Sequence, residues 1–268
     1  EIRTALKAGA IAAAVAVSLG GAIDRIGDIE VLLMMSGLFI LSLWPVLKLP
    51  SLPATEGSAR PNGGPLTGQE ILAGASATWN NQILRAVISC NFASSLFNAG
   101  AYTVAIPFIA KTVYAGGAQT FATALGAITL GAGFSSVLLL WLMPFVNPGR
   151  VFLLFQLTRA AILLALWINF GEWAFYVLMA LWGVNMGVTS TLARSVVQSE
   201  AADTERGKIF SLMLLSFILA SAIGAPILGS IVSSAMPLTA LLPGVVVSVL
   251  IFGFGARTEL WSYRDPEA

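Results

Sequence analysis

The sequence predicts an all-α, polytopic membrane protein, and three observations support this. Apolar stretches of about 20 residues follow one another along most of the chain, and a helix of that length spans a hydrocarbon core of about 30 Å. Short polar turns separate the stretches. Hydrophobic residues make up 57% of the 268 residues and charged residues only 10%, against about 25% charged in soluble domains. We therefore expect these helices to cross a bilayer.

Eight membrane spans follow from these stretches, and most of the connections between them are short. Successive spans are therefore expected to lie side by side and antiparallel. The predicted spans cover residues 3–23, 31–49, 84–110, 120–143, 151–169, 173–194, 208–233 and 236–256.

One connection, residues 50–81, is long. Its first half, 51–65, is rich in Pro, Gly and Ser and predicts a flexible linker. In its second half Thr67 and Glu70 fit a capping box, which predicts a short surface helix over 68–79. The alternative for this second half is a continued linker that contains a chance motif.

Lys and Arg predict the orientation of the spans, because cytoplasmic loops carry an excess of them. With the amino end inside, the outer group contains only Arg25 and Lys111, and Arg159 lies within a span. The inner group is Arg3, Lys7, Lys48, Arg60, Arg85, Arg150, Arg194, Arg206, Lys208, Arg257 and Arg264. We expect a multi-pass protein of a cell membrane, such as a bacterial inner membrane, with both chain ends and the linker cytoplasmic.

The composition excludes several classes of function. A net charge of +1 offers no basic face to nucleic acid, so no nucleic-acid partner is expected. The chain has no His, a single cysteine, Cys90, and no metal-ligand cluster. No phosphate-binding glycine loop appears, so the chain is not expected to hydrolyse nucleotide. We expect neither an enzyme nor a bound cofactor, because no nucleophile–base pair is present.

The first and last pairs of spans share a pattern. Residues 16–21 and 225–230 are rich in small side chains and lie near the outer end of their spans, and a basic cytoplasmic end precedes each span. Small residues let helices approach closely in a bilayer. Two spans precede the long connection and six follow it, so a repeat of six predicts four more helices upstream of Glu1. Transporters often contain two such halves, with the substrate between them.

The turn before the span at 208–233 resembles the major facilitator superfamily. Its residues are Asp203, Thr204, Glu205, Arg206, Gly207 and Lys208. An acidic-Arg-Gly-basic turn at this place is typical of the macrolide-efflux and enterobactin-exporter branch. A glycine turn and the span after it are similar to that branch too, at Gly116, Gly117, Gly126, Gly131 and Gly133. The chain departs from drug antiporters at Ala16 and Val17, where those proteins carry Gly-Pro.

On this resemblance the chain covers helices five to twelve of the family fold. Residues 1–50 are then the last two helices of the N-terminal bundle, 51–82 a cytoplasmic linker with a short surface helix, 83–258 the C-terminal six-helix bundle, and 259–268 a cytoplasmic tail.

The resemblance also implies a secondary active transporter that exports an amphipathic small molecule, drug- or siderophore-like, by alternating access. Its partners would be the lipid bilayer, the small-molecule substrate and the missing N-terminal helices of the same protein. The alternative is a non-transporting scaffold or sensor derived from a carrier.

Proton coupling is a separate question. No Asp or Glu lies inside a predicted span, whereas a proton-coupled carrier needs a membrane carboxylate or His. Either the coupling carboxylate lies in the missing helices, as the resemblance implies, or the protein is not coupled to protons.

A polar stripe runs along the span at 84–110. Its members, at helical spacing, are Asn91, Ser94, Ser95, Asn98 and Tyr102. Such a stripe must face a cavity or partner helices. We favour a wall of the substrate path over hydrogen bonding between helices. Pro107 is expected to bend this span near its outer end.

Two further spans contribute candidate binding residues. Arg159 is the only charge deep in a span, and it contacts either an anionic substrate or structural partners such as Gln156. The resemblance makes its span a peripheral helix and favours the structural role. The span at 173–194 offers a broad apolar pocket with polar groups. Its candidates are Trp182, Asn185, Met186 and Thr189. Gly183 and Gly187 predict a close helix contact there.

The turn at 203–208 is the candidate gate. Asp203 is placed to cap the following helix, and Glu205 favours that helix's positive end. Arg206 lies at the membrane surface, and Gly207 is expected to let another segment approach closely. The alternative is that these charges only set the orientation of the helices.

Overall fold

A computed structural model describes two parts of the chain. The larger part comprises residues 68–143, 145–202, 205–234 and 236–264, and the smaller comprises Ile29, Glu30, Leu33, Ser36 and Gly37. The predicted linker over 51–65 and the predicted span at 3–23 lie outside the described residues, and the span at 31–49 lies largely outside them. The eight-span prediction can therefore be compared with the structure only for the last six spans.

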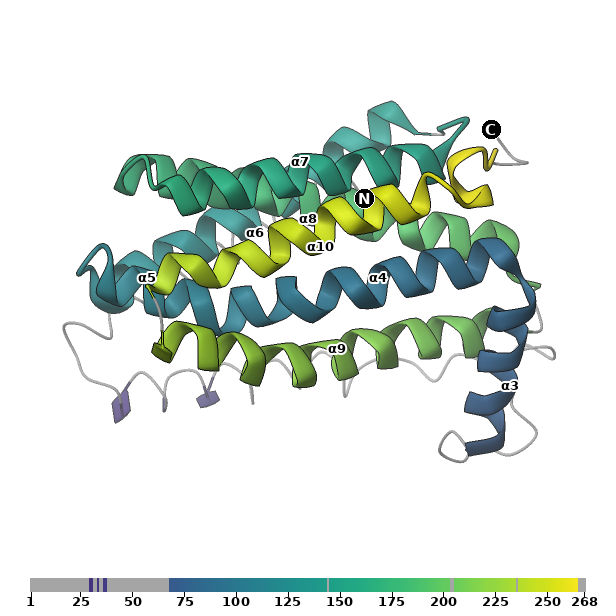
Figure 1. Cartoon of the computed structure of the whole chain (residues 1–268), viewed down its shortest axis with the longest axis horizontal. Coiled ribbons are helices and arrows are strands. Elements are labelled where there is room, and N and C mark those ends of the chain that lie inside the picture. Colours follow the sequence, from purple (N-terminus) through teal and green to yellow (C-terminus); the bar gives the residue numbers. More distant parts are fainter. Residues whose placement is uncertain are drawn as a thin grey trace.

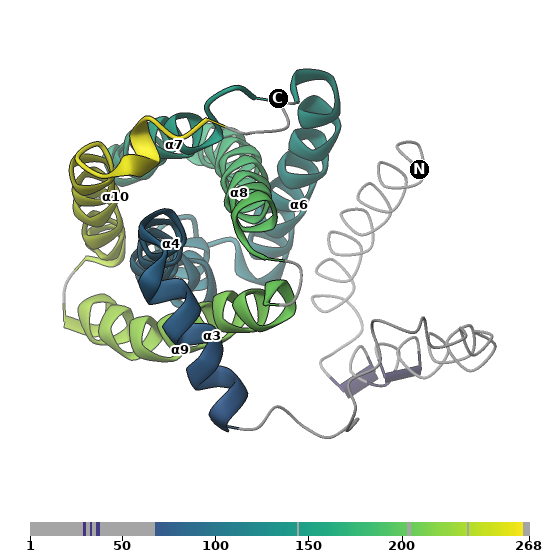
Figure 2. The same cartoon turned by 90° about the vertical axis from the view of Figure 1, so that its right-hand side faces the viewer.

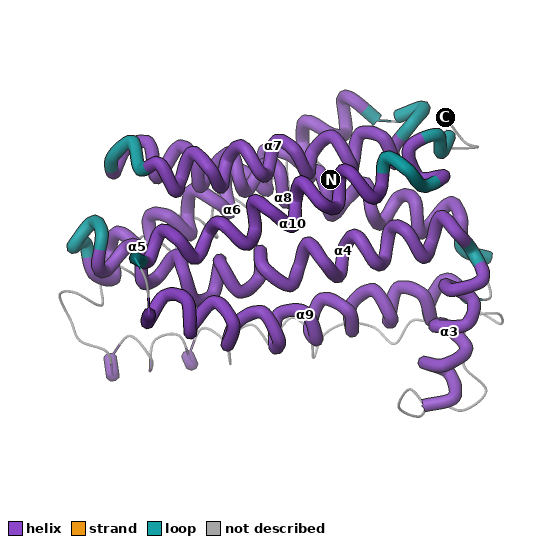
Figure 3. The backbone as a smooth tube through the Cα atoms, in the orientation of Figure 1, coloured by secondary structure: helices purple, strands orange, loops and turns teal. Residues whose placement is uncertain are grey.

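Six helical segments of the described chain are long and apolar enough to cross a membrane. They are Gln82–Thr112, which contains α4 (Gln82–Gly100) and α5 (Ile106–Thr112), then α6 (Gly117–Leu142), α7 (Pro148–Ile168), α8 (Glu172–Glu200), α9 (Arg206–Ser234) and Pro237–Gly255, which contains α10 (Leu242–Gly255). Loops occur only at the two ends of this bundle (Figure 3). These segments coincide with the six predicted spans after residue 83. The largest difference is α8, whose polar last turns continue to Glu200.

A shorter helix, α3 (Gly68–Asn80), precedes the bundle and confirms the helix predicted at 68–79. The alternative of a continued linker over these residues is therefore wrong. Asn81 ends α3 and caps α4, since its Oδ1 accepts from the backbone N–H groups of Ile83 at 2.9 Å and Leu84 at 3.1 Å. As a result α3 runs across the end of the bundle rather than along it (Figure 1).

The six segments pair in a pattern with internal symmetry. The most extensive packing joins α6 to α8, α4 to α9, and α7 to α10. Matching the first three segments in order with the last three makes α4 equivalent to α8, α6 to α9, and α7 to α10. Under this match the α6–α8 pair becomes the α4–α9 pair, and the α7–α10 pair stays the same. Three spans reverse the direction of the chain, so the two units are inverted relative to one another. Figure 2, viewed along the bundle, shows α4 inside an arc of α10, α7, α8 and α9.

Close helix contacts in this bundle depend on glycine. A Cβ on Gly183 of α8 would overlap the carbonyl oxygen of Ile128 on α6, and a Cβ on Gly187 would overlap the Ser135 hydroxyl. The prediction that Gly183 and Gly187 mark a close contact is therefore confirmed. Helices in a bilayer associate through such packing because lipid offers no hydrophobic driving force between them.

The helix that begins with α4 is irregular near its far end. Residues Ala101–Ala105 form a π-helical turn, after which the backbone N–H of Ile106 donates to the carbonyl of Ala101. Pro107 follows at once, and a proline ring clashes with the carbonyl four residues earlier in a regular helix. A wider turn therefore stands just before Pro107, and the bend of the span expected at Pro107 stays a prediction.

We call the end of the bundle where α4 begins the basic end. It carries Arg85, Arg150, Arg194, Arg206, Lys208, Arg257 and Arg264, whereas Lys111 lies at the opposite end. Tryptophans accompany two of these cations, because the Arg85 guanidinium lies 5.6 Å from the ring centre of Trp79 and that of Arg150 lies 4.8 Å from Trp261. Tryptophan beside basic residues is typical of a membrane surface.

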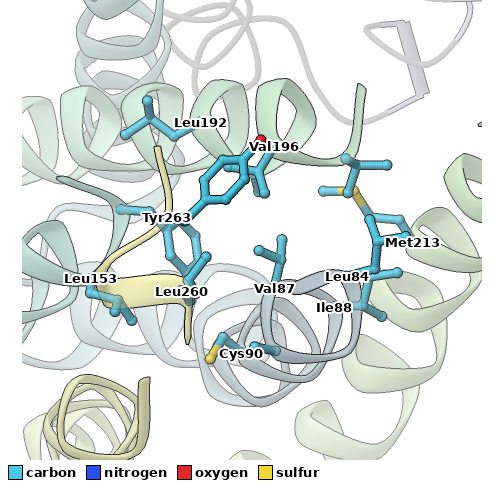
Figure 4. Close-up of a cluster of buried hydrophobic side chains, with 14 of the residues drawn as sticks. Leu84, Val87, Ile88, Cys90, Leu153, Leu192, Val196, Met213, Leu260 and Tyr263 are labelled. Atoms are coloured by element: carbon cyan, nitrogen blue, oxygen red, sulfur yellow. The ribbon is translucent and has the colours of Figure 1, made fainter. Parts of the chain in front are cut away.

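Two apolar clusters fill the interior of the bundle. The cluster near the basic end contains Leu84, Val87, Leu153 and Val196, with Tyr263 from the C-terminal segment beside Val196 (Figure 4). The second cluster lies near the opposite end. Its buried members include Ile106, Ile109, Ile128, Leu163, Leu166, Met179, Trp182 and Leu228. Apolar side chains therefore fill the bundle toward each of its two ends, and the level between the two clusters has a different set of side chains.

Candidate functional site

A layer of polar side chains lies between the two apolar clusters, with Arg159 at its centre. Arg159 comes 11 residues after Pro148, the start of α7, which is about 16 Å along the helix axis. Only 4% of its surface is exposed. A guanidinium at this depth costs about 3 kcal/mol or more to insert into a bilayer, so it requires polar partners.

Arg159 has four hydrogen-bond acceptors, which come from three helices. Its Nε donates to Asn185 Oδ1 at 2.9 Å, and Nη2 donates to Thr189 Oγ1 at 2.8 Å, both on α8. Its Nη1 donates to Gln156 Oε1 on α7 at 3.1 Å and to Ser94 Oγ on α4. One side chain thus joins α4, α7 and α8 at the same level of the bundle.

The acceptors are themselves positioned by further hydrogen bonds. Asn185 Nδ2 donates to the backbone carbonyl of Phe155 and to Thr158 Oγ1, each at 2.7 Å. On α4, Asn98 Nδ2 donates to the Ser94 carbonyl at 2.6 Å and to Ser94 Oγ at 3.0 Å. These additional hydrogen bonds fix the side chains of Asn185 and Ser94, whose oxygens accept from the guanidinium. We call the set the mid-bundle polar layer, and its members are Ser94, Asn98, Gln156, Thr158, Arg159, Asn185 and Thr189.

The mid-bundle polar layer contains a positive charge but no carboxylate. The oxygens around Arg159 belong to neutral amides and hydroxyls. On α8 the acidic residues Glu172 and Glu200 stand at the two ends of the helix, away from this level. Two buried atoms of the layer, Gln156 Nε2 and Asn98 Oδ1, have no hydrogen-bond partner among the described residues. Within the described part of the chain, the layer therefore carries an uncompensated positive charge and is incompletely hydrogen-bonded.

The structure brings together three of the binding residues predicted from sequence, Asn98, Arg159 and Asn185. Of the two alternatives for Arg159, the hydrogen bond to Gln156 that the structural role requires is present. Ser95, one residue from Ser94 on α4, is buried, and Asn91, one turn earlier, is half-buried.

Two other predicted binding residues, Trp182 and Tyr102, lie nearer the opposite end of the bundle, whereas Met186 follows Asn185 directly on α8. Trp182 is 0% exposed and belongs to the apolar cluster there, against which Tyr102 and Met186 also pack. Tyr102 lies in the π-helical turn and is half-buried.

Sequence reasoning missed Thr158. Its only signal is local, because Gln156, Thr158 and Arg159 fall within four positions of an otherwise apolar stretch, with Leu157 among them. The sequence shows Ser94, Gln156 and Thr189 as polar positions and predicts Gln156 as a partner of Arg159, but nothing in the spacing of Ser94 and Thr189 shows that they contact Arg159.

The turn before α9 lies at the basic end. Asp203 lies outside the described residues, so its capping role stays a prediction. The carbonyl of Ala202 accepts from the backbone N–H groups of Glu205 and Arg206, each at 2.9 Å, and α9 begins at Arg206. A Cβ added to Gly207 would meet no described atom within 4 Å. The close approach expected at Gly207 is instead made by Gly74.

Gly74 belongs to α3, and a Cβ there would lie 3.2 Å from the Cβ of Lys208. A hydrogen bond of 3.1 Å from Asn81 Nδ2 to Glu200 Oε2 ties the start of α4 to the end of α8. Beside these contacts is an open pocket of about 520 Å³. It is lined by Ser76, Ala77, Asn80, Asn81 and Glu205. Of the predicted gating residues, Glu205 therefore faces this pocket.

Comparisons of the chain with protein-family models, with curated proteins and with solved structures find no match. Functional inference therefore depends on the sequence and on the geometry of the helices. That geometry combines a buried cation with neutral hydrogen-bonding groups, between two apolar clusters.

Proposed function

We propose that this chain belongs to a secondary active transporter of the major facilitator type, similar to the macrolide-efflux and enterobactin-exporter branch. It would export an amphipathic small molecule, drug- or siderophore-like, by alternating access across a cell membrane such as a bacterial inner membrane. In this proposal the basic end faces the cytoplasm. Coupling to protons would require a carboxylate outside the described spans.

The observation that carries the proposal is the mid-bundle polar layer. A bundle that only anchors a protein has no need of a charge about 16 Å deep between two apolar clusters. In transporters, polar groups near the bilayer midplane bind substrate and coupling ions, and intramembrane charges face the bundle interior. Arg159 and its partners have this depth and face inward.

The pairing of the helices gives independent support. Two inverted units of three spans, packed as α6 with α8, α4 with α9 and α7 with α10, have the organisation of repeats nested within transporter halves. Inverted repeats suit alternating access, because rocking of one repeat or bundle against the other exposes the central site first to one side of the membrane and then to the other.

Transport by the full product of the gene tests this proposal. Reconstituted in liposomes, it is expected to show counterflow of an amphipathic fluorescent dye such as ethidium. Arg159→Gln is expected to reduce counterflow at least tenfold. The same substitution at Arg150, which is exposed on the same helix, is expected to leave it near the wild-type rate. Absence of counterflow in the wild type for a panel of dyes and siderophores would contradict the proposal.

A non-transporting scaffold or sensor is the second candidate, and one observation favours it. Arg159, Gln156 and Asn185 are almost inaccessible, as expected of a structural network. The two candidates differ in the effect of Arg159→Gln. In a scaffold this substitution lowers the unfolding midpoint without any transport to lose, whereas in a transporter it removes transport from protein that is still inserted.

A further inference from the structure

We infer that the mid-bundle polar layer binds a small monovalent anionic group, a carboxylate or a halide, beside Arg159 and Gln156. Such binding would occur whether or not the chain transports a substrate. Arg159 carries a positive charge, and its four acceptors are neutral oxygens. Neutral acceptors satisfy N–H groups but leave a net positive charge in a medium of low dielectric constant, where an anion is strongly attracted.

Gln156 supplies a second and independent observation. Its Oε1 accepts from Arg159, so its amide group adjoins the guanidinium. The side chain is 0% exposed, and Nε2 has no partner among the described residues. Buried donors are nearly always paired in native structures, so an unpaired one indicates a missing acceptor. A buried amide donor without a partner, in the residue that also contacts a guanidinium, is complementary to a negatively charged oxygen or halide.

A bridging water is the competing occupant. A water would accept from Gln156 Nε2, and a water at Asn98 Oδ1, which also has no partner among the described residues, would donate to it. Water would complete the hydrogen bonds but would leave the charge of Arg159 uncompensated. An anion compensates the charge and accepts from Gln156, and a water or hydroxyl that accompanies it can donate to Asn98. The charge therefore favours the anion.

Thermal unfolding of the purified full chain in detergent tests the inference. The reference buffer contains sulfate, a divalent and strongly hydrated anion, and bromide or acetate replaces it at constant ionic strength. The unfolding midpoint is expected to rise with bromide and acetate and to saturate, as for a ligand that binds only the folded state. An equal response to benzoate would identify the ligand as the carboxylate of a larger molecule, and a response to small anions alone would identify a free ion.

Two substitutions at Gln156 make the test specific. Gln156→Leu removes the unpaired donor and is expected to weaken the apparent affinity for acetate about tenfold. Gln156→Glu places a carboxylate beside Arg159, and is expected to raise the midpoint in sulfate and to abolish the response to acetate and bromide. Gln198→Glu, the same change at an exposed position of α8, is expected to keep the wild-type response. A wild type without a saturable response, or an undiminished response in the Gln156 variants, would overturn the inference and leave a bridging water.

Discussion

At the scale of single residues, Arg159 determines the composition of the bundle interior. Inserting its charge costs about 3 kcal/mol or more, while a hydrogen bond between membrane helices contributes on average about 0.6 kcal/mol. Four average bonds come close to offsetting that cost, and bonds to a charged donor are stronger than average. This balance explains why polar residues of α4, α7 and α8 gather around one side chain. It also makes each acceptor of Arg159 energetically important.

Asn185→Leu should therefore destabilise the fold by about 2 kcal/mol, because it leaves the Arg159 Nε–H buried without an acceptor. Ser190→Leu is the matched control, since Ser190 is exposed on the same helix and its hydroxyl donates to the Gly187 carbonyl within that helix. Its expected change is below about 0.5 kcal/mol. Reversible unfolding in mixed detergent micelles gives both values. Equal effects of the two substitutions would show that Asn185 has no special relation to Arg159.

At the scale of helices, glycines that lie against the backbone of a neighbouring helix set the distance between α6 and α8 and between α4 and α9. Gly131 and Gly183 make the α6–α8 pair close, and Gly100 and Gly224 do the same for α4 and α9. Because α6 and α8 approach closely in one orientation, the rotation of α8 about its axis is fixed. That rotation directs Asn185 and Thr189 toward Arg159 and Trp182 into the apolar cluster.

Alanine at two glycines should give effects of opposite sign. Gly183→Ala is expected to lower stability by about 1 to 3 kcal/mol, because its Cβ would overlap the backbone of α6, which cannot move easily. Gly253→Ala in α10 meets no atom within 4 Å and should raise stability by about 0.5 to 1 kcal/mol through helix propensity. The same unfolding assay measures both. A neutral Gly183→Ala would mean that the α6–α8 contact is looser than the structure shows.

At the scale of the whole molecule, the bundle is divided along its axis into layers. Basic residues and tryptophans lie at one end, two apolar clusters fill the interior, and the mid-bundle polar layer separates these clusters. The distribution of Lys and Arg predicts that the basic end is cytoplasmic. Arg159, about 16 Å along α7, places the polar layer near the middle of the bundle.

Labelling of single cysteines tests this orientation. In a Cys90→Ser background, Ala115→Cys lies in the exposed loop at the opposite end and Ser262→Cys lies at the exposed basic end. A membrane-impermeant maleimide should modify Ala115→Cys in intact cells and Ser262→Cys only after permeabilisation. Modification of both from the same side would refute the orientation and the number of spans between them.

The sequence by itself determined the all-helical class, the positions of six spans, the helix at 68–79 and the close contact at Gly183. Each of these depends on local properties, namely hydropathy over about 20 residues, capping chemistry and small side chains. The charge asymmetry is likewise visible in the sequence. The last turns of α8 are polar, so hydropathy gives no signal there. The span predicted at 173–194 therefore ends several residues before the helix does at Glu200.

Only the tertiary structure decided which polar residues form the site. Ser94, Arg159 and Asn185 lie on three helices, and their spacing along the chain does not reveal how those helices are rotated. The packing of α6 on α8, of α4 on α9, and of α7 on α10 and α8 sets these rotations, so Asn98, Arg159 and Asn185 face one another at one level and Trp182 lies among apolar residues. The physical reason is that a hydrogen bond between helices depends on depth and facing direction together, whereas sequence periodicity reports only the stripe along each helix.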